Sequence, residues 1–243
     1  MEEYDSIAEE YTRNEEERIQ TIYLVGPSFM NLLGNLRGLN VLDLACGSGR
    51  FTRKIKLAGA KKVVGADISN EMIRLAKKEE EKNHLGIEYI MLDVTQPKKI
   101  GEFDIVSASF LFHYAKTKKE LFNMCKTCYE NLNEGGRLIS IGPNPKYPLT
   151  NHKKYGFTLE GNEPVREGDE LITKLFSENK EQCSFKFYHW KKETYEKAIR
   201  DIGFRMINWI PLKVSKEGIE KYGREFWKDF LNKPSIIMIE AIK

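Results

Sequence analysis

The sequence lacks the features that would direct it into or across a membrane. No apolar run approaches the ~20 residues that a membrane-spanning helix needs, and the first residues, MEEYD, are acidic, unlike the start of a secretory signal peptide. We therefore expect a cytoplasmic protein with no membrane partner. The length of 243 residues fits one large α/β domain, or a core of ordinary size with an insertion.

The sequence also lacks a concentrated charge of either sign. Its 39 basic and 36 acidic residues give a net charge of only +3. Lysines are interspersed with glutamates, as in the segment KKEEEK at 77–82, which is typical of a solvated helix face. Proteins that follow a phosphate backbone concentrate their positive charge on one face. We therefore expect no nucleic-acid partner.

Cysteine is scarce, and its four occurrences do not form a metal-binding pattern. Cys125 and Cys128 make one Cys-x-x-Cys pair without a second pair or suitably spaced histidines, so we expect no metal site. Leu121, Cys125, Cys128 and Leu132 recur at the spacing of one face of an amphipathic helix. Because free cysteine packs as a small apolar residue, we predict that this face is buried.

The most informative segment that is present is VLDLACGSGRFT at 41–52. Asp43 is the one carboxylate in an apolar strand, which runs into a turn that contains Gly47 and Gly49. Glycines at such a junction let a ligand lie against bare backbone. Asp67 ends the next apolar strand, about 20 residues beyond Gly47, which is the spacing at which an acid reaches the two hydroxyls of a ribose. The pattern predicts a site for a nucleoside-containing cofactor at the open end of a parallel sheet.

The same segment lacks the parts that would bind phosphate. A dinucleotide fingerprint has a third glycine where this chain has Thr52, and no Lys-Ser/Thr pair of a P-loop follows. The pattern Asp43-x-Ala45-x-Gly47-x-Gly49 resembles motif I of the class I S-adenosylmethionine-dependent methyltransferases, whose cofactor has a ribose but no phosphate. The resemblance implies that the cofactor is S-adenosylmethionine and that its product is S-adenosylhomocysteine.

Helix-like and strand-like patterns alternate along the chain, which predicts a parallel sheet with helices on both faces. Strands are expected at 41–44, 62–66, 87–92, 103–108, 137–141, 205–210 and 235–242. Helices are expected at 51–57, 70–83, 118–131, 194–202 and 216–230. The resemblance implies an α/β fold with a doubly wound, seven-stranded, mostly parallel Rossmann-like sheet whose last strand is antiparallel.

We expect residues 1–243 to form a single methyltransferase domain with two additions. Residues 1–35 would form an N-terminal helical cap, and residues 146–190 would be an insertion after the fifth strand. Apolar and polar residues tend to alternate in the insertion at 157–160, 170–176 and 184–188. Alternation predicts a small antiparallel sheet. As a lid over the cofactor crevice, that sheet would enclose a small molecule and exclude a polymer.

The resemblance assigns cofactor binding to residues at the strand ends. Asp43 would orient the turn and the methionine end of the cofactor, Asp67 would bind the ribose, and Asp93 would border the adenine. The complete set that the resemblance implies is Tyr11, Asp43, Ala45, Gly47, Gly49, Asp67, Ile68, Asp93, Val94, Ser109 and Phe110. Tyr11 ends the segment YDSIAEEY at 4–11, which in similar enzymes folds over the cofactor with a tyrosine hydroxyl near its carboxylate. Packing of an amphipathic helix on the sheet is the alternative for this segment.

The cofactor determines what the protein has to supply for catalysis. A sulfonium is already an activated electrophile, so the protein chiefly holds a nucleophile in line with the S–CH₃ bond, and positioning can supply effective molarities of ~10⁵ M or more. The segment FLFHY at 110–114 offers aromatic side chains beside one titratable group. His113 could accept a proton from the nucleophile or could only shape the pocket, and the sequence leaves both roles open.

Three further segments narrow the resemblance: FLFHYA at 110–115, YHW at 188–190 and FWKDFL at 226–231. They resemble toxoflavin synthase-like N-methyltransferases and phosphonate O-methyltransferases of natural-product pathways. This resemblance implies methyl transfer to nitrogen or oxygen of a small-molecule acceptor, either a heterocycle or a phosphonate- or carboxylate-type metabolite. The residues expected to bind the acceptor are Tyr23, Tyr114, Arg166, Tyr188 and His189.

Several alternatives remain open at the level of the sequence. An anionic acceptor would use cationic side chains, for which Arg166, Lys174, Lys186 and His189 are available. A heterocycle would stack on aromatic side chains, for which Tyr23, Phe112, Tyr114 and Trp190 are available. The alternative functions are a non-catalytic S-adenosylmethionine-binding protein and a methyltransferase that acts on RNA or protein. Monomer and homodimer are equally compatible with the sequence.

Overall fold

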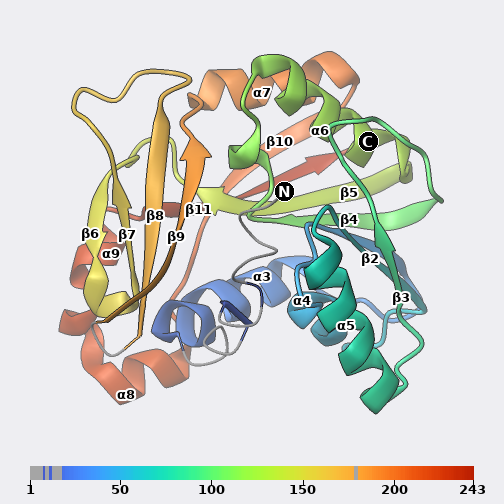
Figure 1. The fold of residues 1–243 in the computed structure, drawn as a ribbon, viewed down its shortest axis with the longest axis horizontal. Coiled ribbons are helices and arrows are strands. Elements are labelled where there is room, and N and C mark those ends of the chain that lie inside the picture. The colour runs from blue at the N-terminus through green and yellow to red at the C-terminus, as the bar shows by residue number, and fades with distance from the viewer. Residues whose placement is uncertain (1–7, 9–10, 13–17, 178–179) are drawn as a thin grey trace.

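The computed structural model describes residues 8, 11–12, 18–177 and 180–243, and a seven-stranded sheet forms its centre (Figure 1). The strands of this sheet are β1 (Asn40–Leu44), β2 (Lys62–Asp67), β3 (Glu88–Met91), β4 (Phe103–Ser109), β5 (Leu132–Pro143), β10 (Arg205–Pro211) and β11 (Ile236–Ile242). They lie in the order β10-β11-β5-β4-β1-β2-β3. Strands β1 to β5 are parallel, and β11 is antiparallel to both of its neighbours. The seven-stranded, mostly parallel sheet implied by the resemblance is confirmed.

Helices cover both faces of the central sheet because successive strand residues point to opposite sides. The helices are α3 (Gly26–Leu33), α4 (Arg50–Leu57), α5 (Asn70–Asn83), α6 (Lys118–Glu130) and α7 (Lys192–Ile202). Val41 of β1 belongs to the core that α3, α4 and α5 cover, whereas its neighbour Leu42 belongs to the core under α6 and α7. The hydroxyl oxygens of Ser69 and Thr117 cap α5 and α6 by accepting backbone N–H groups of the first turn.

The described residues of the N-terminal region are mostly helical. A π-helix, η1 (Thr21–Val25), leads directly into α3, whereas Tyr4 of the segment expected to fold over the cofactor lies outside the described residues. Within the described ranges, none of the helices is long and apolar enough to cross a membrane.

The predicted cysteine-bearing face is buried. Leu121, Cys125 and Cys128 of α6 have no exposed surface, and Leu132 is also buried. Leu132 belongs to β5, however, because α6 ends at Glu130 and β5 begins five residues before the strand predicted at 137–141. Leu132 pairs with Phe103 of β4, and the register shifts before the regular pairing resumes. An irregular strand start of this kind has no alternating pattern from which to predict it.

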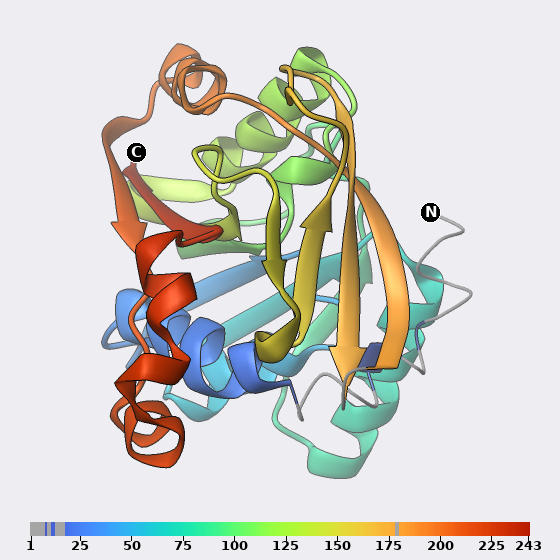
Figure 2. The ribbon, with the colours of Figure 1, turned by 90° about the vertical axis from the view of Figure 1, so that its left-hand side faces the viewer.

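A second sheet, which we call sheet B, is antiparallel and stands beside η2 (Phe112–Tyr114), the turn that follows β4 (Figures 1 and 2). Its strands are β6 (Thr150–His152), β7 (Phe157–Glu160), β8 (Glu170–Ser177) and β9 (Lys180–Tyr188), in that order. The antiparallel sheet expected within 146–190 is confirmed. Strand β6 adds to the predicted strands because three residues are too few to show an alternating pattern.

An aromatic cluster fastens sheet B to the helices near the C-terminus, α8 (Lys216–Phe226) and α9 (Lys228–Asn232). Tyr155, in the short turn η3 (Lys153–Tyr155) between β6 and β7, stacks on Trp227 with ring centroids 5.2 Å apart and planes 4° from parallel. Its hydroxyl donates to the carbonyl of Phe226 at 2.7 Å. The single helix predicted at 216–230 is wrong, because Gly223 leaves the helical conformation (φ 76°, ψ 160°) and α8 ends before Trp227.

We expect Tyr155→Phe to destabilise the protein by about 1–2 kcal/mol. The substitution keeps the stacked ring but leaves the partly buried carbonyl of Phe226 without its donor, and it removes the oxygen that accepts the N–H of Phe230 at 3.3 Å. Urea unfolding of the two proteins measures the difference. Tyr222→Phe is the matched control, because the Tyr222 hydroxyl has no hydrogen bond within the described residues. Equal effects of the two substitutions would contradict the fastening role.

Candidate functional site

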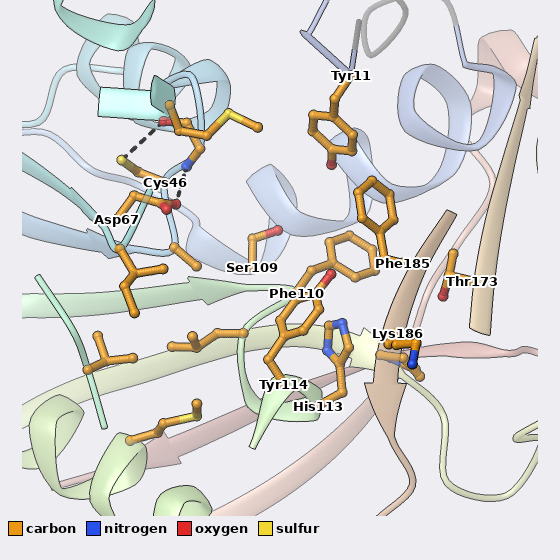
Figure 3. A pocket seen from close by; sticks show the side chains of 18 of the residues that line it. Tyr11, Cys46, Asp67, Ser109, Phe110, His113, Tyr114, Thr173, Phe185 and Lys186 are labelled. Carbon is orange, nitrogen blue, oxygen red and sulfur yellow. Dashed lines mark hydrogen bonds between the residues drawn. The ribbon is translucent and has the colours of Figure 1, made fainter. Parts of the chain in front are cut away.

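A cavity of about 710 Å³ lies between the carboxyl ends of the central strands and sheet B (Figure 3). Pockets that hold small-molecule ligands and cofactors usually measure about 300–1,000 Å³. One side of the cavity, which we call the cofactor half, is formed by the ends of β1, β2 and β3 with the turns that follow them. The other side, the acceptor half, is formed by the segment after β4 together with sheet B.

A buried carboxylate organises the turn between β1 and α4. Asp43 is 1% exposed, and its two oxygens accept hydrogen bonds from the hydroxyls of Thr52 at 2.6 Å and Ser107 at 2.7 Å. Burial raises the pKa of Asp43 to about 6, although these two hydrogen bonds oppose the shift. Thr52, which replaces the third glycine of a dinucleotide fingerprint, therefore joins α4 to β1. Ala45 begins the turn with φ +54°, a left-handed conformation that residues with a side chain rarely adopt.

A second carboxylate fixes the other end of this turn. Asp67 Oδ2 accepts the backbone N–H of Gly47 at 2.8 Å, a contact that Figure 3 shows, and Asp67 Oδ1 accepts the N–H of Ser69 at 2.9 Å. Asp67 also lines the cavity, which places its carboxylate beside the space for a ligand. The turn and the predicted ribose-binding acid are thus held as one unit.

The third strand-end carboxylate lies at the far side of the cofactor half. Asp93 Oδ1 accepts both the backbone N–H of Thr95, at 2.9 Å, and its hydroxyl, at 2.7 Å. Val94 and Thr95 line the cavity beside it. Asp43, Asp67 and Asp93 therefore lie at or just beyond the carboxyl ends of three adjacent strands, which is the arrangement that the spacing of the acids predicts.

The segment after β4 turns sharply into the acceptor half. Phe110 has φ +53°, and its N–H donates to the carbonyl of Ile141 at 2.7 Å. The ring of His113 lies 4.3 Å from that of Tyr114, and it meets Phe187 of β9 edge-on at 5.7 Å. Burial lowers the pKa of His113 to about 3. The imidazole is therefore neutral at physiological pH.

Most of the residues predicted for the site line this one cavity. They are Tyr11, Asp43, Ala45, Gly47, Asp67, Ile68, Asp93, Val94, Ser109, Phe110, His113, Tyr114 and Tyr188. Within the described residues, no group of three or more His, Cys, Asp or Glu side chains is placed to hold a metal ion.

Gly49 was predicted to contact the cofactor, but it does not line the cavity. It adopts φ +83° at the start of α4, and a side chain there would meet the hydroxyl of Tyr89. The close approach of Tyr89 and the left-handed backbone therefore account for glycine at this position.

Tyr23, Arg166 and His189 also lie outside the cavity lining, contrary to the predicted acceptor site. Tyr23 is buried under α8, and its hydroxyl accepts a hydrogen bond from Lys221 Nζ at 2.9 Å. Arg166 is exposed in the loop before β8, where its N–H donates to Asp169. The backbone N–H of His189 donates to the carbonyl of Asp169 in the same region. Both residues lie in loops next to Glu170 and Tyr188, whose side chains do line the cavity, and the sequence could not show which of these neighbours face it.

Arg18 is a cavity residue that the sequence did not reveal, because it belongs to no motif. Its side chain is 5% exposed, its Nη2 donates to the carbonyl of Tyr11 at 3.1 Å, and its guanidinium lies 4.7 Å from the centre of the Tyr11 ring. The Nε atom has no hydrogen-bond partner, and Arg18 forms no ion pair, within the described part of the chain. A buried charge that forms no ion pair is costly, so a ligand carboxylate at this point of the cavity would stabilise it.

Comparison with known proteins supports the same assignment. Residues 41–136 match a family model described as a methyltransferase domain. An uncharacterized protein of Haemophilus influenzae is 26% identical over 230 residues, which cover 89% of this chain and 86% of that protein. The demethylmenaquinone methyltransferase of Lactococcus lactis is 28% identical over 204 residues, covering 78% and 73% of the two chains.

Solved structures share the fold. An S-adenosylmethionine-dependent methyltransferase from Mesorhizobium loti superimposes with a TM-score of 0.67 at 18% identity, covering 94% of this chain and 99% of that one. The DhpI–SAM–HEP complex gives a TM-score of 0.60 at 16% identity, with 98% and 93% coverage. At these identities the likeness establishes the architecture, and the matched methyltransferase domain contains the three strand-end carboxylates.

We expect Asp67→Ala to weaken S-adenosylmethionine binding by ~10–150-fold, because hydrogen bonds to a charged group contribute ~1.5–3 kcal/mol. The substitution removes the acceptor for the ribose and also releases the N–H of Gly47. Isothermal titration calorimetry measures the affinity, and Glu81→Ala, at an exposed position of α5, is the control. Wild-type affinity in Asp67→Ala, or comparable affinity for NAD(H), would contradict the cofactor assignment.

Arg18 predicts a ligand-specific effect. If its guanidinium binds the carboxylate of the cofactor, Arg18→Gln should weaken S-adenosylhomocysteine binding by ~10–150-fold and leave 5′-methylthioadenosine, which lacks the amino-acid tail, unaffected. Arg74→Gln, at an arginine paired with Glu71 on the surface of α5, is the control. An equal loss for both ligands would instead show that Arg18 supports the shape of the cavity.

The burial of His113 predicts sensitivity to acid. Its pKa falls from 6.5 to about 3 on folding, so the unfolded chain binds an extra proton between these values, and the stability present above pH 6.5 is lost as the pH falls. From pH 7 to pH 5 this loss is about 2 kcal/mol. Asp43, whose pKa is raised, acts in the opposite direction. The test therefore compares two proteins by urea unfolding at pH 7 and pH 5. The free energy of unfolding should fall by about 2 kcal/mol more in the wild type than in His113→Gln. Equal losses would contradict the lowered pKa of His113.

Proposed function

Because the chain is a class I S-adenosylmethionine-dependent methyltransferase, we propose that it transfers the methyl group to a nitrogen or oxygen atom of a small-molecule acceptor. The observation that carries this proposal is the enclosure of the cavity by sheet B. Phe157 of β7, Thr173 of β8 and Phe185 of β9 line the same cavity as Asp67 and Phe110. An acceptor placed beside the cofactor therefore lies between two sheets rather than on an open surface.

The enclosure and the charge of the protein both favour a small acceptor over a polymer. Sheet B rests on the aromatic cluster around Tyr155 and Trp227, which supports it as a fixed wall of the cavity. A net charge of +3 spread over the surface offers little attraction to a nucleic acid. The demethylmenaquinone methyltransferase of Lactococcus lactis is named for a small-molecule substrate, which agrees with this proposal.

The chain's own residues provide positioning and a dry environment for the transfer. When bound, S-adenosylmethionine supplies an electrophilic methyl group and leaves as S-adenosylhomocysteine. Asp67 and Asp93 would hold the nucleoside, and Arg18 would hold the amino-acid tail, so that the methyl group faces the acceptor half. Phe110 and Tyr114 exclude water there, which suits a reaction that disperses charge. Catalysis would then rest chiefly on the geometry of the two bound molecules.

His113 fits the role of a neutral pocket residue better than that of a general base. A base works best when its pKa is near the operating pH, and burial holds the pKa of His113 at about 3. The imidazole would orient the acceptor by hydrogen bonding and pack against Tyr114. The proton of the acceptor would then pass to solvent.

The function is tested by methyl transfer from S-adenosylmethionine to a panel of hydroxylated and nitrogen-containing metabolites, with RNA and proteins as competing acceptors. We expect turnover with a member of the metabolite panel, with a rate that shows no inflection attributable to His113 between pH 5 and 8. His113→Gln should retain most of the rate, because an amide can replace a hydrogen bond. Transfer to RNA or protein alone would refute the proposal, and a loss of at least ~10²-fold in His113→Gln would restore the role of a base.

A further inference from the structure

The acceptor half of the cavity is lined mainly by aromatic side chains from separate segments. Phe110 and Tyr114 come from the segment after β4, Phe185 from β9, and Tyr11 from the N-terminal region. Tyr11 meets Phe185 edge-on at 5.5 Å. Figure 3 shows these rings gathered around the space next to Ser109, on the opposite side of the cavity from Asp67. Flat faces arranged in this way complement a flat ligand, because aromatic pairs gain energy in stacked or edge-on contacts.

Of the two lysines that line the cavity, the one on sheet B is already neutralised by an acid of the same sheet. Lys186 Nζ lies 2.8 Å from Glu170 Oε1, and both residues are exposed where they line the cavity. Lys174, another candidate for binding an anion, lies outside the lining and pairs with Glu160 at 3.0 Å. An anionic acceptor would have to break such a pair, whereas an uncharged acceptor leaves it intact.

The buried cationic groups of the cavity are two arginines. Arg18 lies beside Tyr11, at the border of the acceptor half, where it would serve the cofactor's carboxylate, and Arg50 opens α4 directly after the cofactor turn. The remaining lining lysine, Lys116, is exposed, and its own backbone N–H donates to Glu120. Apart from Arg18, which the carboxylate of the cofactor would neutralise, the acceptor half has no buried cation among the described residues.

Two neutral polar groups face the aromatic space and lack partners. The hydroxyl of Ser109 is inaccessible to solvent and has no hydrogen bond within the described residues. The ring of His113 likewise has none there, and it remains neutral because burial disfavours its charged form. A buried polar group without a partner is unfavourable, so a ligand with a matching polar edge would stabilise the hydroxyl of Ser109.

We propose that the acceptor is an uncharged, planar aromatic or heteroaromatic ring whose hydroxyl or N–H group faces Ser109 and His113. The ring plane would lie among Phe110, Tyr114 and Phe185. This proposal rests on the proposed function and narrows it, because it chooses between the two acceptor classes that the sequence left open. The ring contributes the flat surface that the aromatic lining requires, and the hydroxyl or N–H group satisfies the unpartnered polar groups.

Three matched probes test the proposal in the protein saturated with S-adenosylhomocysteine: 2-naphthol, 2-naphthoate and decahydro-2-naphthol. They share a two-ring skeleton but differ in charge and planarity. We expect calorimetric titration to give a dissociation constant for 2-naphthol at least ten-fold lower than for either of the others. Tighter or equal binding of 2-naphthoate would overturn the inference in favour of an anionic acceptor. If the saturated alcohol binds as tightly as 2-naphthol, or if none of the probes binds, the proposal of a planar acceptor ring is wrong.

Two variants locate the site within the cavity. Phe185→Leu should reduce the preference for 2-naphthol over decahydro-2-naphthol to less than three-fold, because it removes one aromatic face. Ser109→Ala should weaken the binding of 2-naphthol and leave the binding of naphthalene, which has no hydroxyl, unchanged. Phe122→Leu, at a partly exposed position of α6 outside the cavity, should change neither. The titration of S-adenosylhomocysteine itself separates the two proposals: failure of that titration would remove the proposed function, whereas its success with failed probes would remove only the assigned acceptor class.

Discussion

The buried carboxylate of Asp43 is the interaction on which both halves of the cavity depend. One oxygen binds Thr52 at the start of α4, and the other binds Ser107 in β4, two residues before Ser109. The turn that would hold the cofactor and the strand that presents the acceptor segment are therefore attached to the same group. Asp67 extends this arrangement to β2 by holding Gly47. A change at Asp43 would consequently disturb the relative position of the two bound molecules as well as the local turn.

The cofactor half could be predicted from the sequence because its signals are local. Each of Asp43, Asp67 and Asp93 follows an apolar run directly, and parallel strands bring such positions to one edge of a sheet. Gly49 shows the limit of this reasoning. Its place in the motif was read correctly as a position that needs glycine, but the cause is the neighbouring Tyr89, a residue about forty positions away along the chain.

The acceptor half depends on contacts between distant segments, which no spacing rule describes. Tyr23 and His189 have the right residue types for a binding site, yet neither lines the cavity. Tyr23 packs under α8, and His189 lies just beyond Tyr188, the last residue of β9. Arg18 has no motif at all, and only its burial against Tyr11 reveals it. The match to the methyltransferase domain ends at residue 136, before sheet B begins. Sheet B, which forms one wall of the acceptor half, therefore lies outside the matched domain.

The left-handed conformation of Ala45 has a consequence for the thermodynamics of ligand association. A residue with a side chain visits few backbone conformations, so the turn between β1 and α4 is less free to move than a turn with glycine at this position. The hydrogen bonds from Asp43 and Asp67 restrict it further. Less conformational entropy remains to be lost when a ligand settles against the turn. With such preorganisation, the entropic cost of ordering the turn is met when the protein folds, and ligand binding does not have to meet it again.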